Sequence, residues 1–297
     1  MNILIAGSSG FIGSALRKHL LSSGHTVCRL VRQESSVAQD EIAWNPARQN
    51  LPTDKLAVFD AVVNLCGENL LGLWTLAKKR RIYSSRIDTT AFLASAIAAS
   101  RPRPPIFVCA SAIGFYGSRG DEILTEQSPQ GKGFLAGVCL DWEKAAAPES
   151  LTGVRIVNLR LGMVLDPSGG ALAKMLPPFK MGLGGPLGDG THWQSWISLT
   201  DCVRAIEFAL LTASLSGPVN AVSPQPMRNI DFTRLLADVL GKPAKLKTPA
   251  GILRLLPGGF ADEVLLSSIR AIPQKLLNAG FTFHYPSLCE FFKSCLR

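Results

Sequence analysis

The turn formed by the first thirteen residues constrains the fold more than any other part of the chain. Asn2 to Ala6 is a short apolar, β-rich run, and three glycines follow it at G-x-x-G-x-x-G spacing. Helical spacing begins after the third glycine, so the turn joins a buried parallel strand to a helix. Backbone amides at such a helix N-terminus can approach a pyrophosphate. The alternative is that the glycines only form a tight turn between strand and helix and bind no ligand. The pattern predicts a dinucleotide site built from Gly7, Ser9, Gly10, Phe11, Ile12 and Gly13.

The second expected strand, residues 26–31, ends at Arg32, and this position decides the choice of cofactor. In NAD sites an acidic residue about 20 residues beyond the glycines bonds the ribose hydroxyl, whereas an arginine there accommodates the 2′-phosphate of NADP. Glu34 comes only after Arg32. We therefore predict NADP(H) as the cofactor, with Arg32 on its extra phosphate. The alternative is that Glu34 bonds the ribose and Arg32 is an ordinary exposed charge.

Two later apolar runs, residues 60–64 and 106–110, are expected to be neighbouring strands of the same sheet. Ligands of such sheets lie outside the carboxyl ends of the strands. Arg86, in the helix between the two runs, is a further candidate for the cofactor site. Ser111 is expected to face the reacting end of the cofactor, with a bond to its own turn as the alternative. The candidate cofactor contacts at the two strand ends are Leu65, Cys66, Gly67, Glu68 and Ala110.

Composition limits the remaining possibilities. With 47% hydrophobic and 18% charged residues, the 297 residues can bury the core of one α/β domain with a smaller lobe. We find no long apolar run and no leader, so we expect a cytoplasmic protein without a membrane partner. The seven scattered cysteines predict free thiols and no metal. The net charge of +9 fits a phosphate-rich ligand, and without a binding motif we expect no nucleic acid. The basic run Lys78 to Arg81 is expected to be a solvated helix face.

Several motifs resemble those of the extended short-chain dehydrogenase/reductases, namely the glycine turn, Ser111-Ala-Ile-Gly-Phe-Tyr-Gly and Trp196-Ile-Ser-Leu-Thr-Asp. More closely, the chain is similar to the YfcH-type epimerase family, described as nucleoside-diphosphate-sugar epimerases and formerly as cell-division inhibitors. The blocks that carry this second similarity are Leu159-Arg-Leu-Gly-Met-Val-Leu, Met175-Leu-Pro-Pro-Phe and Gly182-Leu-Gly-Gly-Pro. The similarity spans essentially the whole chain.

The resemblance implies an α/β fold, a doubly wound parallel sheet of the Rossmann type with a small mixed C-terminal substrate lobe. We expect the NADP-binding domain at residues 1–165 and 199–223, and the substrate lobe at 166–198 and 224–297. It also implies that Leu161, Gly162 and Met163 contact the nicotinamide end and that Arg228 meets the substrate. The stretch 169–190, rich in glycine and proline, is expected to be a loop over the substrate, with Gln194 as a donor nearby.

The reactive unit of the wider superfamily, a Tyr-x-x-x-Lys pair, is absent. The lysine of that pair lowers the pKa of the tyrosine, which exchanges a proton with the substrate while hydride passes to the nicotinamide. Here none of the three tyrosines has a lysine four residues later. Alignment on Trp142-Glu143 places Leu135 and Cys139 at the two positions. Tyr116 and His192 are the alternative candidates for proton transfer, the second because its ordinary pKa lies near neutrality.

Two classes of function follow from these features. The first is an NADP-dependent oxidoreductase or epimerase acting on a nucleotide-sugar or similar polar metabolite. The second is a non-catalytic NADP(H)-dependent sensor or scaffold that kept the cofactor site without the proton relay. The expected partner is a small molecule, and the protein is expected to be a monomer or homodimer. The segment near Trp142 could form either a dimer face or part of the core.

Overall fold

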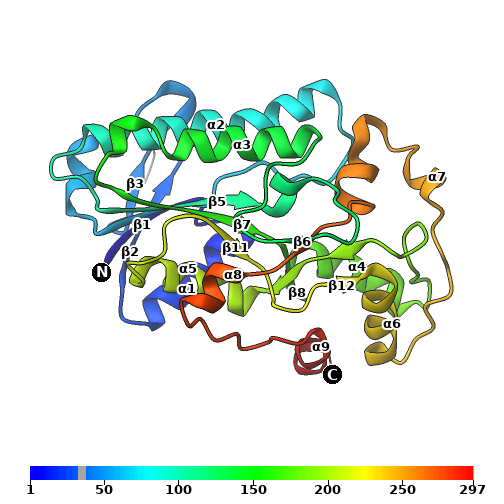
Figure 1. The fold of residues 1–297 in the computed structure, drawn as a ribbon. Coiled ribbons are helices and arrows are strands. Elements are labelled where there is room, and N and C mark those ends of the chain that lie inside the picture. The colour runs from blue at the N-terminus through cyan, green and yellow to red at the C-terminus, as the bar shows by residue number, and fades with distance from the viewer. Residues whose placement is uncertain (33–37, 297) are drawn as a thin grey trace.

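The centre of the molecule is a seven-stranded parallel sheet. The computed structural model describes residues 1–32 and 38–296 (Figure 1). The strand order β11-β7-β5-β4-β1-β2-β3 reverses direction at β1, which pairs with β2 on one side and β4 on the other. This switch point opens a crevice at the carboxyl ends of the strands, as in doubly wound sheets. The strands are β1 (Asn2–Ala6), β2 (Thr26–Val31), β3 (Glu41–Ala43), β4 (Ala61–Asn64), β5 (Ile106–Ala112), β7 (Arg155–Leu161) and β11 (Gly217–Ala221).

Helices cover both faces of the sheet, which is why the central strands are apolar on both sides. Helices α1 (Phe11–Ser22) and α5 (Leu199–Leu211) pack on one face, and α2 (Leu76–Ala99) and α3 (Phe134–Ala146) on the other (Figure 1). Trp142 of α3 is buried and donates to the Thr90 hydroxyl of α2 over 2.9 Å. That contact places Trp142 in the core of this chain. The expected doubly wound fold is confirmed.

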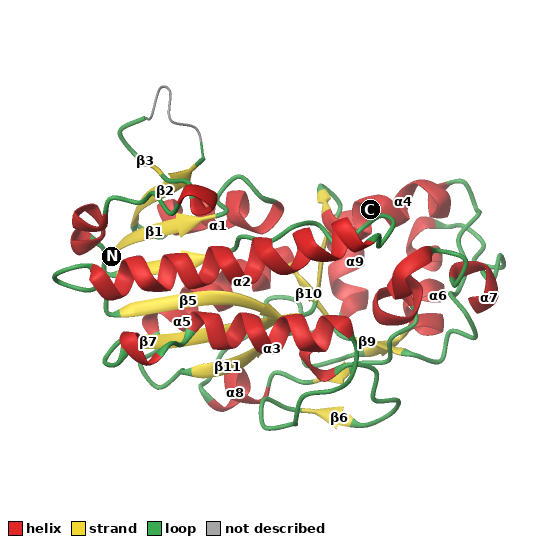
Figure 2. Ribbon diagram, turned by 90° about the horizontal axis from the view of Figure 1, so that it is seen from above, coloured by secondary structure: helices red, strands yellow, loops and turns green. Residues whose placement is uncertain are grey.

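A second lobe lies beyond the carboxyl ends of the strands (Figure 2). Its helices α4 (Gly170–Lys180), α6 (Asn229–Leu240) and α9 (Leu288–Leu296) share one apolar core. Short strand pairs connect it to the sheet domain: β8 (Met163–Asp166) with β10 (Trp196–Ser198), β9 (Trp193–Gln194) with β12 (Met227–Arg228), and β6 (Ile123–Leu124) with β13 (Arg270–Ala271). The shorter helical elements are η1 (Pro46–Arg48), η2 (Thr53–Val58), η3 (Ile113–Tyr116), η4 (Glu149–Leu151), α7 (Ala250–Leu253), η5 (Pro257–Gly259), η6 (Ala261–Leu265) and α8 (Gln274–Asn278).

The last part of the chain returns to the sheet after passing through the second lobe. Leu276 of α8 and Phe281 are buried in the same core cluster as the strand residues Ile3 and Val219. The predicted substrate lobe, residues 224–297, therefore contains a stretch that packs on the sheet. Across the described ranges, with their gap at 33–37, we find no helix of the length and apolarity that crossing a bilayer demands.

One local expectation was wrong, and two local features were not anticipated. The stretch 169–190 contains a helix, α4, because Leu172, Leu176 and Phe179 recur on one face and pack into the lobe core, and this burial outweighs the two prolines inside the helix. Helix α5 is capped by Ser198, whose hydroxyl accepts from the Asp201 amide over 2.9 Å. The short edge strand β3 was not among the strands expected from the sequence.

Candidate functional site

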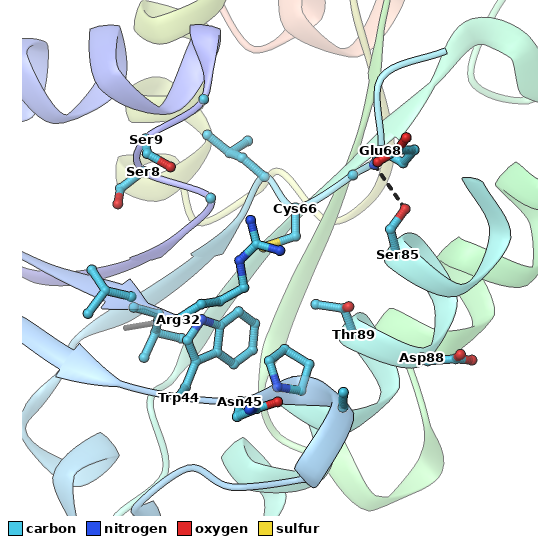
Figure 3. Close-up of a pocket in the computed structure, with 18 of the residues that line it drawn as sticks. Ser8, Ser9, Arg32, Trp44, Asn45, Cys66, Glu68, Ser85, Asp88 and Thr89 are labelled. Carbon is cyan, nitrogen blue, oxygen red and sulfur yellow. Dashed lines mark hydrogen bonds between the residues drawn. The ribbon is translucent and has the colours of Figure 1, made fainter. Parts of the chain in front are cut away.

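A cavity of about 760 Å³ opens at the switch point of the sheet (Figure 3). Its walls come from the glycine turn after β1, the ends of β2 and β3, the loop after β4 and the first half of α2. Segments far apart in sequence meet here because parallel strands place all their carboxyl ends at one edge. Its volume is within the range of ligand pockets in proteins.

The glycine turn has the geometry that a pyrophosphate requires. Gly7 has φ +80°, and a Cβ on Gly13 would stand only 2.1 Å from the carbonyl oxygen of Gly7. Helix α1 therefore approaches the turn at a distance that only glycine permits. Within the described part of the chain no side chain caps α1, and its first turn contains no acidic residue. The first amides of the helix are thus oriented to bind an anion.

The ends of β2 and β3 form a second wall. Arg32 follows β2, is exposed, and extends toward Cys66 across the cavity (Figure 3). Trp44 follows β3, lines the same cavity, and stacks on Phe92 of α2 with ring centroids 6.3 Å apart. The Arg32 guanidinium could bind a phosphate, and the rigid Trp44 ring beside it could contact a flat base of the same ligand. Glu34, the alternative ribose ligand, lies outside the described residues.

The loop after β4 forms a third wall and is held from behind. The Glu68 amide donates to the Ser85 hydroxyl over 2.9 Å (Figure 3), and the hydrogen bond from Lys78 lowers the pKa of the Glu68 carboxyl. The Arg86 guanidinium donates to the Glu68 carbonyl over 3.0 Å and lies 5.1 Å from the Trp142 ring, and burial lowers the pKa of Arg86. Arg86 thus braces the loop and does not line the cavity. Burial raises the pKa of Cys66 to about 12, so its thiol stays neutral.

The predicted cofactor residues divide into three sets. Those that line the cavity are Gly7, Ser9, Gly10, Arg32, Leu65, Cys66, Gly67 and Glu68. Phe11, Ile12 and Gly13 form the first turn of α1 beside it. Ala110, Leu161, Gly162 and Met163 lie at the ends of β5 and β7 outside the lining. The cofactor roles of all these residues stay predictions.

Sequence reasoning missed several residues of the cavity. The polar cavity residues on α2 come just after the basic run Lys78 to Arg81. They were overlooked because that part of the helix was expected to be a solvated face. The ones at the end of β3 were overlooked because that strand was not anticipated. The signal for the second set was Trp44-Asn-Pro, an aromatic followed by a turn after a short β-rich run. The missed residues are Ser8, Arg29, Leu30, Val31, Trp44, Asn45, Pro46, Ala47, Ser84, Ser85, Asp88 and Thr89.

Ser111 belongs to a buried polar network on the α3 side of β5. Its hydroxyl donates to Glu143 Oε1 over 2.7 Å, and Arg160 donates to both oxygens of the same carboxylate over 2.8 and 2.9 Å. Burial opposes the Arg160 charge, but the bonds with Glu143 raise the pKa of Arg160 overall. These contacts favour a structural role for Ser111, and its catalytic role stays a prediction.

Tyr116 is part of the same network. Its hydroxyl donates to Asn220 Oδ1 over 2.7 Å and accepts from Arg160 over 3.0 Å, and its side chain is fully buried. Burial raises the pKa of Tyr116. A proton donor needs access to its substrate, and a phenol enclosed in this way has none. The surroundings argue against the predicted proton transfer by Tyr116.

The two positions of the missing relay lie on α3 against η3. A Cβ on Gly114 would contact Leu135 Cβ at 3.4 Å and Cys139 Sγ at 3.7 Å. Burial raises the pKa of Cys139 to about 12, so this thiol cannot act as the lysine does. Glu263 of η6 accepts from the Phe134 and Leu135 amides over 3.0 and 2.7 Å. The second lobe thus occupies the N-terminus of the helix that would carry the relay.

The candidates in the second lobe are not brought to the cavity. His192 is 7% exposed, burial lowers its pKa, and its Nε2 has no partner among the described residues. Gln194 Oε1 is likewise buried without a partner there. Arg228 donates to Asp121 Oδ1 over 2.9 Å and lies 4.8 Å from the Trp193 ring. The roles of these residues toward a substrate stay predictions.

Comparison with known proteins identifies the class to which this fold and cavity belong. Residues 3–221 match the NAD dependent epimerase/dehydratase family, and residues 248–295 match a domain of unknown function, DUF1731. The chain belongs to the NAD dependent epimerase/dehydratase family. It is 43% identical to an epimerase family protein of Mycobacterium tuberculosis over 97% of this chain and 95% of the relative. It is 35% identical to the epimerase family protein SDR39U1 of Bos taurus over 97% of each chain.

Solved structures agree with this assignment. The crystal structure of human SDR39U1 (isoform 2) with NADPH has a TM-score of 0.88 at 31% identity and covers 99% of each chain. A nucleoside-diphosphate sugar epimerase from Corynebacterium glutamicum has a TM-score of 0.83 at 37% identity, covering 100% of this chain and 58% of that one. The UDP-glucose 4-epimerase of Thermus thermophilus with NAD, at 18% identity and a TM-score of 0.75, supports the fold alone.

Proposed function

We propose that this protein binds NADP(H) in the cavity at the switch point. The observation that carries the proposal is the pairing of an uncapped helix N-terminus at Gly10 with Arg32 across one cavity of about 760 Å³. The amides would hold the pyrophosphate, Trp44 would line the adenine, and Arg32 would bond the 2′-phosphate. The relative crystallised with NADPH supports the same choice.

We further propose an oxidoreductase or epimerase that acts on a nucleotide-sugar or similar polar metabolite. Bound NADP(H) supplies the hydride exchange. The chain would position the cofactor through the glycine turn, and Glu263 joins the second lobe to the N-terminus of α3. The name of the Corynebacterium glutamicum neighbour and the YfcH-type motifs support this substrate class.

A second candidate function is a non-catalytic NADP(H)-dependent sensor or scaffold. It is favoured by the side chains at the relay positions, Leu135 and Cys139, neither of which can donate a proton near neutral pH. Tyr116, which shares an apolar cluster with Cys139, is enclosed by Arg160 and Asn220.

Two measurements test the proposals. Calorimetry on cofactor-stripped protein should show binding of NADPH that is tighter than binding of NADH. Arg32→Ala should remove this difference, whereas Arg48→Ala, at an exposed arginine outside the cavity, should keep it. No uptake of either dinucleotide would reject the cofactor proposal.

Bound NADPH is then mixed with a panel of nucleotide-sugars and polar carbonyl compounds while nicotinamide absorbance is followed. Oxidation by one member supports the enzyme. No oxidation by any member, together with tight NADPH binding, supports the sensor.

A further inference from the structure

A second, smaller cavity lies between the start of α3 and the second lobe. Its volume is about 200 Å³, and across the described ranges no residue lines both this cavity and the one at the switch point. Its walls come from η3 and the residues after it, from the first residues of α3, and from parts of the segment 262–269. Boundaries between packed units are a common place for small ligands. We call this space the interlobe cavity.

Hydrogen bonds join the walls of the interlobe cavity to one another. The Ser268 amide donates to Ser118 Oγ over 3.1 Å, and the Arg119 amide donates to the Ser268 carbonyl over 2.9 Å. The Glu263 carboxylate accepts from the first two amides of α3 over 3.0 and 2.7 Å. The segments around the cavity therefore hold each other in place, and the cavity is part of the fold.

Lys132 is fixed beside the interlobe cavity by the packing of its backbone. Gly117 has φ +61°, and a Cβ there would stand 2.6 Å from the carbonyl oxygen of Lys132. Only glycine allows the loop before α3 to approach η3 so closely. Lys132 lines the cavity, and its ammonium group ends a flexible four-carbon stem, so it can follow a ligand within a space of this size.

The charges around the interlobe cavity cancel. Asp262 and Glu263 contribute two carboxylates to its lining. Lys132 supplies one opposing charge, and Arg254, which pairs with Asp262 at 2.9 Å, supplies the other. An anion would meet the two carboxylates and a cation would meet the lysine, whereas an uncharged ligand meets no like charge. The electrostatics therefore favour an uncharged ligand.

The remaining groups of the lining suit alcohols. The Ser118 hydroxyl accepts from an amide and keeps its own proton to donate, and the Ser267 hydroxyl can both donate and accept. The Lys132 ammonium adds donors. Leu135 and Ile269 supply apolar surface against which a short carbon chain can lie. Hydroxyl groups on such a chain offer the matching donors and acceptors.

We propose that the interlobe cavity binds a small uncharged polyhydroxy compound. Its volume is below the range of pockets that enclose drug-sized ligands, so it is too small for a nucleotide-sugar. The ligand hydroxyls bond Ser118, Ser267 and Lys132, and the carbon chain contacts Leu135. Binding here uses no residue of the cavity at the switch point, so it goes beyond the proposed function and holds for an enzyme or for a sensor.

The test is saturation-transfer NMR on the full chain with four probes, each measured with and without NADPH. Erythritol and glycerol are uncharged, whereas glycerate and serinol are three-carbon counterparts with a negative and a positive charge. We expect the uncharged probes to bind in both conditions, and glycerate and serinol to bind at least about fivefold more weakly than glycerol. Because NADPH is not needed, failure of the cofactor proposal would leave these signals unchanged.

Two variants locate the bound probe. Lys132→Met keeps the length of the side chain but removes its donors, and should lower the affinity for erythritol roughly tenfold. Ser267→Phe should abolish binding, because its ring fills the cavity. Lys174→Met is the matched control, since Lys174 is an exposed lysine of α4 that lines neither cavity. This variant should bind erythritol like the wild type.

Four results would overturn the proposal. The first is no saturation transfer to erythritol or glycerol, and the second is binding of glycerate or serinol as strong as that of glycerol. The third is wild-type affinity in Lys132→Met, or in a Ser267→Phe protein that keeps the wild-type melting temperature. The fourth is an equal loss in Lys174→Met, which would show that the probes contact lysines all over the surface.

Discussion

Replacing Glu143 by alanine should destabilise the protein far more than a typical loss of one ion pair. The Glu143 and Arg160 side chains are 12% and 4% exposed and are joined by two hydrogen bonds, with Ser111 on the same carboxylate. Glu143→Ala leaves a buried guanidinium without a counter-charge, which costs about 3–5 kcal/mol. For a chain of this size that loss corresponds to a fall in melting temperature of roughly 6–10 °C.

Urea unfolding followed by circular dichroism measures the free energy of unfolding. Glu122→Ala is the matched control, because the Glu122–Arg119 pair has a similar distance of 2.7 Å but an exposed carboxylate, so its loss should cost about 1 kcal/mol or less. Replacing Glu143 and Arg160 together by methionine should recover most of the stability, since no charge is then left uncompensated. A loss below about 1 kcal/mol for Glu143→Ala would refute the reasoning.

Three further outcomes are expected. Arg32→Ala should weaken NADPH binding about 10- to 100-fold in calorimetry and leave NADH binding unchanged, because only NADPH carries the phosphate that Arg32 is proposed to bond. An equal loss for both dinucleotides would contradict this. Gly13→Ala should lower the melting temperature and NADPH affinity together, because its Cβ would stand 2.1 Å from the Gly7 carbonyl oxygen; an unchanged variant would show that the turn relaxes. Burial lowers the pKa of His192 from its ordinary 6.5, so the unfolded chain binds more protons and stability should fall as pH drops below about 6.5. His192→Gln should flatten that dependence in urea titrations between pH 5 and 7.5, and an unaltered slope would rule out His192 as its source.

The sheet could be predicted because its signals are local. An apolar run of strand length before a glycine turn needs no knowledge of the rest of the chain, and β1, β4 and β5 were located in this way. Helix α4 was missed because proline and glycine are local signals as well, and here burial of Leu176 and Phe179 in the second lobe outweighs them. Its apolar spacing of three and four residues was present in the sequence.

The site was predictable only where the chain approaches it at strand ends. Gly10 and Leu65 follow strands directly, so their place at the cavity could be inferred from the rule for parallel sheets. Thr89 reaches the cavity from the middle of α2, and nothing in its neighbours along the chain marks that contact. The network of Ser111, Glu143 and Arg160 joins residues 17 to 49 positions apart, so a serine at a strand end could not be distinguished from a catalytic one.

The interleaving of the two lobes limits how this architecture can be altered by recombination. Glu263 is bonded to the first amides of α3, and α8 then inserts Leu276 into the central core. A chimera that exchanged everything after residue 248 with a distant relative would have to preserve both contacts at once. Sequence changes in the C-terminal region should therefore be accompanied by changes in the first domain, and the region should not fold correctly when it is moved alone into a distant relative.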